Sequence, residues 1–316
     1  MADLLADEGR RFIVASHQNP DGDAVGSMLG FGRALAAAGR DVVLWHPDPD
    51  PVPAELAFLV APGERIRADP PADAAERTLL ALDCASAARL GDRPPGELAR
   101  LVVNVDHHHD NTRFGDVNLV DGAASSTAEL VLRLLRAAGL PLTREVAEPL
   151  YVALVTDTGR FGYANATPEA HRAAAELIEA GVEPAPVSRR LYEERPLDSV
   201  LLLGRALAGA RSLLDGRLVL GVLAEADFAA AGTDDTEGIS EALRGVRGAE
   251  VAALAREVPE GWRVSLRAAG DAVDVSAIVR ETGGGGHRAA AGGTFPGSLE
   301  ELLPWLERAV AAQLDG

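Results

Sequence analysis

Short, continuous apolar runs alternate with longer stretches of mixed polarity through the first half of the chain. The runs cover residues 11–16, 78–82, 101–105 and 150–156. Apolar runs of this length, separated by segments with helical periodicity, are typical of strands that a parallel sheet buries on both faces. The pattern therefore predicts an α/β fold whose N-terminal part contains a mainly parallel sheet.

The segments between these runs predict further regular structure. We expect helices at 24–38, 126–138 and 168–180, and one more strand at 41–45. Ser125–Thr127 stands at the start of the second of these helices and predicts its N-cap, with Glu129 close to the capping-box spacing. A supporting role of this segment beside a functional site stays open.

The pattern changes near residue 190. The composition shifts around Pro184 and Pro186, and 189–210 indicates a helical connector with a break at Pro196. A second α/β unit follows, in which we expect strands at 210–214, 218–223, 250–257 and 263–268. Since 316 residues exceed the usual size of a single domain, two domains are expected. We predict the division as an N-terminal domain (1–188), a linker (189–209) and a C-terminal domain (210–316).

Acidic and histidine side chains stand where the predicted strands end. They form four groups along the chain: His17, Asp21 and Asp23; Asp83; Asp106, His107 and His108; and Asp157. The carboxyl ends of strands in an open α/β sheet meet at the edge where ligands bind, so we expect all four groups to lie together. Carboxylates and imidazoles gathered in this way are the ligands of a two-cation phosphoryl-transfer site.

Counting ligands assigns a role to each side chain. Two divalent cations roughly 3.5 to 4 Å apart can hold the attacking and the leaving oxygen of a displacement at phosphorus, and they need one bridging carboxylate. Asp83, alone at its strand end, suits the bridge, while His17 and Asp21 are spaced to serve one cation. The side chains left for the second cation are Asp23, His107 and Asp157. A mixed shell of oxygen and imidazole favours Mn²⁺, with Mg²⁺, Co²⁺ or iron as alternatives.

Each group also has an ordinary structural explanation. The segment 19–23 is a favourable turn sequence, Asp83 could cap a helix, and Asp157 could begin a turn. Three adjacent imidazoles at 107–109 are harder to explain as a surface run. Four such groups, in order at four strand ends, favour the cation site over four separate coincidences.

The same residues carry a resemblance to a known family. Four segments resemble the motifs of the DHH phosphoesterase superfamily: Ser16–Ser27, Ala81–Asp83, Val105–His108 and Val155–Gly159. Gly283–His287, followed by Ala289–Gly292, is similar to the substrate-binding loop of the DHH-associated domain. Motif order, spacing and the second domain most resemble the NrnA type, which combines nanoRNase activity with hydrolysis of 3'-phosphoadenosine 5'-phosphate (pAp).

The resemblance implies a metal-dependent hydrolase with an N-terminal DHH domain and a smaller C-terminal α/β DHH-associated domain, joined by a helical linker. Such an enzyme converts short oligoribonucleotides of two to about five residues to mononucleotides, and pAp to AMP and phosphate. The second domain would hold the far end of the substrate.

Candidate catalytic and binding residues follow from the motifs. Asp83 and His108 would act at the reacting phosphorus, with His108 stabilising charge on the phosphoryl oxygens, and Asp106 would orient a neighbouring imidazole. We assign substrate binding to Asn111, Arg267, Gly284, Gly285, Gly286 and His287. Without the resemblance, the glycine run would be a flexible loop and Arg267 the solvent side of a strand. Asn111 could contact a phosphate or stabilise a turn.

The balance of charge restricts the substrates. The chain has 30 basic residues, all of them arginine, against 48 acidic residues, which gives a net charge of -18. Proteins that bind long nucleic acids usually present a basic stripe, so long polymers are disfavoured as partners. Short RNA oligonucleotides, pAp and cyclic dinucleotides stay compatible, since a few arginines and two cations can supply positive charge locally.

Four other functions remain open at this point: a c-di-AMP phosphodiesterase, an inorganic pyrophosphatase, a RecJ-like exonuclease and a nucleotide-binding regulator without catalysis. Hydrolysis of cyclic dinucleotides uses a similar pair of domains. A pyrophosphatase gives less reason for the glycine-rich loop, and a RecJ-like enzyme is expected to carry further domains and a basic groove. The complete group of candidate cation ligands argues against a regulator.

The expected cellular compartment is inferred from the lack of a membrane-spanning run and of a signal-peptide pattern in the sequence. No apolar run reaches the ~18 residues of a membrane helix, and the first residues lack the basic flank and apolar core of a signal peptide. Cys84, the single cysteine, excludes an internal disulfide and is expected to be a small buried thiol. We therefore expect a cytoplasmic protein without a membrane partner; whether it forms a homodimer stays open.

Overall fold

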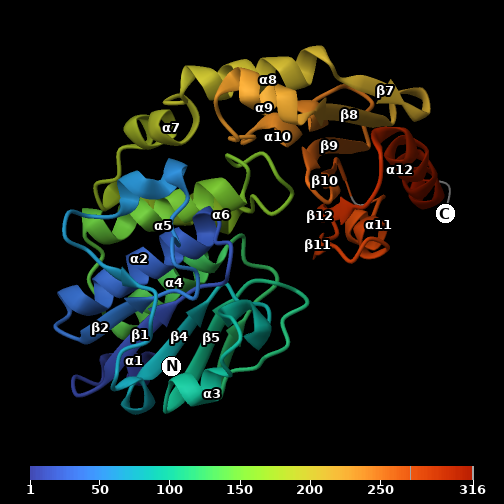
Figure 1. Cartoon of the computed structure of the whole chain (residues 1–316). Helices are drawn as coiled ribbons and strands as arrows, with labels where there is room; N and C mark the ends of the chain where they lie inside the picture. The colour runs from blue at the N-terminus through green and yellow to red at the C-terminus, as the bar shows by residue number, and fades with distance from the viewer. Residues whose placement is uncertain (271, 315–316) are drawn as a thin grey trace. The chain divides into compact units, whose positions relative to one another are not determined.

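The chain folds into two compact units, Met1–Glu194 and Arg195–Gly316 (Figure 1). The structure is a computed structural model that describes residues 1–270 and 272–314, except for the side chain of His287. The predicted change near residue 190 falls close to the division between the units. The assignment of 189–209 as a linker stays a prediction.

The first unit contains a six-stranded sheet with the order β3-β2-β1-β4-β5-β6, in which every neighbouring pair is parallel. Its strands are β1 (Arg11–Ala15), β2 (Asp41–Trp45), β3 (Ile66–Arg67), β4 (Thr78–Leu82), β5 (Leu101–Asp106) and β6 (Val117–Val120). The predicted α/β fold with a parallel sheet is confirmed, and the strands expected at 11–16, 41–45, 78–82 and 101–105 are present.

Seven helices belong to this unit: α1 (Ala2–Ala6), α2 (Gly22–Ala37), α3 (Pro95–Leu98), α4 (Thr127–Ala138), α5 (Arg144–Asp157), α6 (Pro168–Glu179) and α7 (Pro184–Tyr192). Three short 3-10 segments complete it: η1 (Ala54–Leu59), η2 (Ala74–Glu76) and η3 (Ala87–Leu90). The helices expected at 24–38, 126–138 and 168–180 are confirmed. Ser126 is the N-cap of α4, as the sequence predicts.

Both faces of the sheet are buried, which explains the continuous apolar runs. Phe12 and Val14 of β1 join the core under α2, α4 and α5, whereas Ile13 and Ala15 join a second cluster with residues from η3 and α3. Successive side chains of a strand point to opposite faces, so a strand covered on both sides is apolar at most positions on either face.

One predicted strand is wrong. Residues 150–156 belong to α5, so Asp157 stands at the C-terminal end of a helix instead of a strand. The residues from Leu150 to Val155 are all buried, because α2, α4 and α6 surround this part of α5. A helix that is apolar all round gives the same short apolar run as a buried strand, and periodicity cannot separate the two.

Three glycines of α2 bring it unusually close to α5. A Cβ atom on Gly26 would lie 2.3 Å from the carbonyl oxygen of Pro149, and one on Gly30 would lie 2.6 Å from Cγ of Leu150. At Gly22, in the first turn, a Cβ atom would lie 2.2 Å from Oγ1 of Thr156. The start of α2 therefore lies directly beside the end of α5, where Asp157 is located.

We expect Gly26→Ala to destabilise the protein by about 1–3 kcal/mol, because the added methyl group forces the two helices apart. Gly204→Ala is the matched control: an added Cβ at this helical glycine meets no atom within 4 Å, and the change should stabilise by about 0.5–1 kcal/mol. Urea denaturation followed by circular dichroism measures both. Equal stabilities of the two variants would contradict the close contact between α2 and α5.

The second unit has a six-stranded sheet with the order β11-β12-β10-β9-β8-β7. Only β8 and β9 pair in parallel; the other neighbours are antiparallel. Its strands are β7 (Arg211–Leu213), β8 (Leu218–Leu223), β9 (Val251–Val258), β10 (Gly261–Ala268), β11 (Gly285–His287) and β12 (Ala290–Phe295). Its helices are α8 (Leu197–Ala208), α9 (Glu225–Ala231), α10 (Ile239–Arg244), α11 (Val275–Arg280) and α12 (Leu299–Leu314), with a 3-10 turn η4 (Leu214–Gly216).

The four strands predicted in the second unit correspond to β7, β8, β9 and β10. The predicted helical connector consists of the end of α7 and of α8, and Pro196 is the N-cap of α8, where the break is expected. The glycine run is not loop throughout, because Gly285 and Gly286 pair with β12. Within the described residues, no helix combines the length and the apolar character that crossing a bilayer requires.

Candidate cation centre

The carboxyl edge of the first sheet gathers most of the predicted ligands. His17 follows β1, Asp83 follows β4, and His107 and His108 follow β5. Helices supply the remaining side chains: Asp21 and Asp23 at the start of α2, and Asp157 at the end of α5. The predicted meeting of all four groups at one edge is thus observed, with a helix in place of the fourth strand.

Among the residues that the structure describes, three groups of side chains are arranged so that each could hold a cation. Within each group the potential ligand atoms lie within 4.8 Å of one another. The groups are Asp83, His107 and His108; His17, Asp21 and Asp83; and Asp23, His107 and Asp157. Asp83 and His107 each belong to two groups, so the three groups form one continuous centre.

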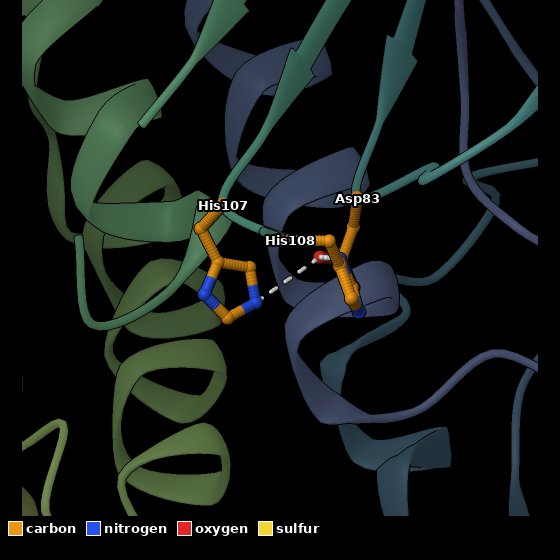
Figure 2. A group of neighbouring side chains, drawn as sticks. All are labelled: Asp83, His107 and His108. Atoms are coloured by element: carbon orange, nitrogen blue, oxygen red, sulfur yellow. Dashed lines mark ion pairs between the residues drawn. The ribbon is translucent and has the colours of Figure 1, made fainter. Parts of the chain in front are cut away.

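Asp83 lies in the middle of this centre. Its Oδ1 atom is 3.6 Å from both Nε2 of His107 and Nδ1 of His108, and its Oδ2 atom is 3.5 Å from Nε2 of His17. Figure 2 shows the imidazoles of His107 and His108 beside its carboxylate. The backbone of Asp83 is left-handed (φ 59°), a conformation that non-glycine residues retain mainly at functional sites. This position suits the predicted bridging role.

The first turn of α2 orients the two aspartates near it. Oδ1 of Asp21 accepts from the backbone N–H groups of Asp23 and Ala24, which caps the helix and leaves Oδ2 at 4.0 Å from Nε2 of His17. Asp23 is 1% exposed, and its Oδ2 lies 3.8 Å from Nε2 of His107. Asp157 approaches the same nitrogen, at 3.6 Å.

A second layer of hydrogen bonds surrounds Asp106, the buried last residue of β5. Its Oδ1 atom is 2.7 Å from Nδ1 of His108 and accepts from the backbone N–H of His107 at 2.9 Å. Asp106 therefore lies where it can orient His108, the role predicted for it. Nδ2 of Asn111 donates to Oδ2 of Asp106 and also to Oδ1 of Asn104. The amide of Asn111 thus supports this layer, and its predicted contact with substrate stays a prediction.

The protonation of the centre reflects crowded carboxylates. Burial raises the pKa of Asp157 to about 7, and the carboxylates of Asp83 and Asp21 add to the rise. Burial would lower the pKa of His107, but the nearby carboxylates, Asp83 foremost, raise it to about 9. Burial also works to raise the pKa of Asp83, yet the hydrogen bond with His17 and the charges of the imidazoles hold it well below its usual range. Protons on Asp157 and His107 therefore offset part of the negative charge of the carboxylates, and bound cations could offset this charge instead.

Sequence reasoning missed His46, which follows β2 at the same edge. Nδ1 of this fully buried histidine accepts from the N–H of Asp48 at 3.1 Å, so Nε2 donates to the backbone oxygen of His17 at 2.9 Å. The contact fixes the loop that carries His17. A histidine at the end of the predicted strand 41–45 was the available signal. Cys84, by contrast, is the buried thiol that the sequence predicts.

The substrate-binding candidates of the second unit lie on β10 and around β11. Nε of Arg267 is 3.5 Å from Oε1 of Glu241. Gly284 touches the backbone of Gly292, since a Cβ atom there would lie 2.5 Å from its carbonyl oxygen, whereas Gly285 faces open space. Gly286 has a φ of 141°, which favours glycine. The side chain of His287 lies outside the described residues. Contacts of all these residues with substrate stay predictions.

Comparisons with known proteins add an independent observation. The sequence pattern of the DHH family, N-terminal domain, matches residues 11–154, and that of the DHHA1 domain matches residues 222–312. The chain is 40% identical to the bifunctional oligoribonuclease and PAP phosphatase NrnA of Thermus thermophilus, over 98% of this chain and 92% of that protein. It is 27% identical to the protein of the same name from Bacillus subtilis, over 90% and 88% of the two chains.

The fold has a close counterpart among solved structures. An exopolyphosphatase-related protein from Bacteroides fragilis superposes with a TM-score of 0.88 at 25% sequence identity. The match covers 96% of this chain and 93% of that one. The similarity therefore extends over both units.

Proposed function

The chain belongs to the DHH family, within its NrnA type, and on that basis we propose that it hydrolyses short RNA oligonucleotides to mononucleotides and pAp to AMP and phosphate. The name of the Thermus thermophilus relative states these two activities for that protein. The observation that carries the proposal here is the continuous centre in which Asp83 and His107 each join two groups of potential ligands.

The donor atoms of this centre fit two divalent cations. The three groups contain only carboxylate oxygens and imidazole nitrogens, and the one nearby thiol, Cys84, is buried and donates to the carbonyl oxygen of Leu82. This donor chemistry favours Mn²⁺, with Mg²⁺ or Co²⁺ as alternatives. We assign His17, Asp21 and Asp83 to one cation, and Asp23, His107 and Asp157, together with Asp83, to the other.

The side chains around the centre have distinct tasks. Bound cations would lower the pKa of water and neutralise charge on the phosphoryl oxygens. His108 is held through Nδ1 by Asp106, which directs the opposite ring nitrogen away from that carboxylate. Burial would lower the pKa of His108, but the hydrogen bond with Asp106 and the charge of Asp83 raise it, which favours the doubly protonated ring. In that form Nε2 can donate a hydrogen bond to a phosphoryl oxygen as negative charge builds up on it. Asp106 and Asn111 keep the imidazole in this orientation.

We propose a division of labour along the chain. Residues 1–188 would form the catalytic domain, residues 189–209 a linker, and residues 210–316 a substrate-holding domain. In the last of these, Arg267, His287 and the backbone of Gly284–Gly286 would contact the end of the substrate that does not react. Glycines without a Cβ let backbone N–H groups approach an anionic group, which supports this role of the loop.

Initial rates with Mn²⁺ test the function. We expect rapid hydrolysis of pAp and of RNA from two to five nucleotides, slow hydrolysis of c-di-AMP, and no turnover in excess EDTA. A clear preference for c-di-AMP would replace the proposal with a cyclic dinucleotide phosphodiesterase. Tight binding of pAp without turnover, in a protein loaded with cations, would indicate a regulator.

The affinity for Mn²⁺ should rise between about pH 6 and pH 9, because protons compete with cations for the same ligands. Below pH 7 both Asp157 (pKa about 7) and His107 (pKa about 9) hold protons, and above pH 9 neither does. Binding near neutral pH should therefore release protons. Calorimetry in buffers of different ionisation enthalpy measures the release. A His109→Ala control, which alters an exposed imidazole, should leave the dependence unchanged; an affinity independent of pH would contradict the assignment.

A further inference from the structure

The N-terminus of α4 contacts a candidate ligand from a distant part of the chain. Ser126 caps the helix by accepting from the N–H of Glu129 at 3.2 Å. The two preceding N–H groups, those of Thr127 and Ala128, donate instead to the carboxylate of Asp23, at 2.6 and 3.0 Å. Two of the free donors of the first helical turn thus bind a side chain that lies 104 residues before Thr127.

Thr127 also contacts the other central carboxylate. Its hydroxyl group donates to Oδ1 of Asp83 at 2.9 Å. Thr127 is 0% exposed, so no solvent competes for these hydrogen bonds. One residue therefore links Asp23 through its N–H and Asp83 through its O–H, although the two aspartates come from different elements.

These contacts determine which oxygen of Asp23 can face a cation. Oδ1 accepts from Ala128 and from the hydroxyl group of Ser27, both at 3.0 Å, and a carboxylate oxygen has two lone pairs. Oδ2 accepts only from Thr127 among the described residues and lies 3.8 Å from Nε2 of His107. One lone pair of Oδ2 is therefore available to a cation in the centre.

The same contacts hold Asp83 in an uncommon conformation. A left-handed backbone at a non-glycine residue persists where the surroundings fix it, and Asp83 is fixed by its N–H, which donates to Val105, and by Thr127. With Oδ1 bound by Thr127 on the side of His107, Oδ2 turns to His17. The two oxygens of Asp83 are thereby divided between the two candidate cation positions.

We propose that Thr127 is a positioning residue of the cation centre, which fixes Asp23 and Asp83 relative to each other so that Asp83 can bridge two cations. The inference rests on the proposed function. The positive end of the dipole of a 12-residue helix, α4, adds to the effect by favouring a negative charge on Asp23. Removing only the hydroxyl group of Thr127 should then weaken cation binding without removing any ligand.

Titration of the full-length protein with MnCl₂ measures this effect. We expect Thr127→Val to lose about 10- to 100-fold in affinity for Mn²⁺, the usual effect of a hydrogen-bond partner of a metal ligand. Thr127→Ser, which keeps the hydroxyl group, should bind like the wild type. Thr78→Val is the matched control, since Thr78 is equally buried but stands at the opposite end of β4. Wild-type affinity in Thr127→Val would overturn the proposal.

A second measurement needs no cation. In EDTA, the shifts of the urea midpoint caused by Thr127→Val and Asp83→Ala should be non-additive in the double variant, because both changes remove the same hydrogen bond. Additive shifts would overturn the proposed contact. If the wild type binds fewer than two Mn²⁺, the two-cation function fails, and this double-mutant cycle still decides whether Thr127 orients Asp83.

Discussion

Asp83→Ala is expected to abolish hydrolysis and to remove at least one bound cation while the protein stays folded. Asp83 belongs to two of the three groups of potential ligands, and its oxygens face three imidazoles. Charge stabilisation by a metal ion is worth several kcal/mol, so the rate should fall on the order of a thousandfold or more. Asp83 follows the last residue of β4 and contributes little apolar packing, so circular dichroism should show a native fold.

Asp110→Ala is the control, because this aspartate is exposed and belongs to none of the three groups. Its rate on pAp and its content of Mn²⁺, measured by elemental analysis, should equal those of the wild type. A folded Asp83→Ala protein that retains both cations and hydrolyses pAp at a near-normal rate would remove Asp83 from the centre.

The parallel sheet and its functional edge could be predicted because a strand buried on both faces has a run of apolar residues in its sequence. β1, β4 and β5 are covered on both faces, so their interior positions are almost all apolar. The exception is Asn104 of β5, whose buried amide donates to the carbonyl oxygens of Ala81 and Cys84. The first polar groups after these strands then stand at the carboxyl edge, where His17, Asp83 and His107 are observed. Sequence alone sufficed here since the constraint acts on neighbouring residues.

The position of Asp157 shows where this reasoning fails. Its apolar run predicts a strand, whereas the structure has a helix that packs against the glycines of α2. The close contact between α2 and α5 is a tertiary contact, and the apolar run at 150–156 does not indicate it. The residue was nevertheless expected in the correct place, because the end of α5 reaches the same edge as the strands.

The contacts of Thr127 could not be predicted for a related reason. The serines and threonine at the start of α4 predict an N-cap, which is a local role, and Ser126 fulfils it. The partners of Thr127, Asp23 and Asp83, precede it by 104 and 44 residues. Nothing in the local sequence distinguishes an N–H group that binds water from one that binds a distant carboxylate. Only the packing of α4 against the start of α2 reveals it.

RNA length should limit turnover sharply. A long polyanion gains affinity by releasing counterions along many basic contacts, whereas a centre with a few arginines holds one phosphate and the first bases. This chain carries a net charge of -18, and several of its arginines are already paired with carboxylates, as Arg33 is with Glu64 and Arg77 with Asp41 and Asp73.

We therefore expect that, with Mn²⁺, the rate per cleavage event is highest on RNA of two to about five nucleotides. The rate should fall by at least tenfold once the length passes about ten nucleotides, which is the order of magnitude for one binding cleft without an extended basic track. Initial rates on RNA of two, three, five, ten and twenty nucleotides measure the limit. Added KCl separates two causes of this fall, because salt screens charge repulsion. If missing basic contacts cause it, long RNA should still be hydrolysed slowly in KCl. If repulsion by the acidic surface causes it, KCl should raise the rate on long RNA. Degradation of the 20-mer at or above the rate of the dinucleotide would instead indicate a processive exonuclease and would overturn the assignment to short RNA.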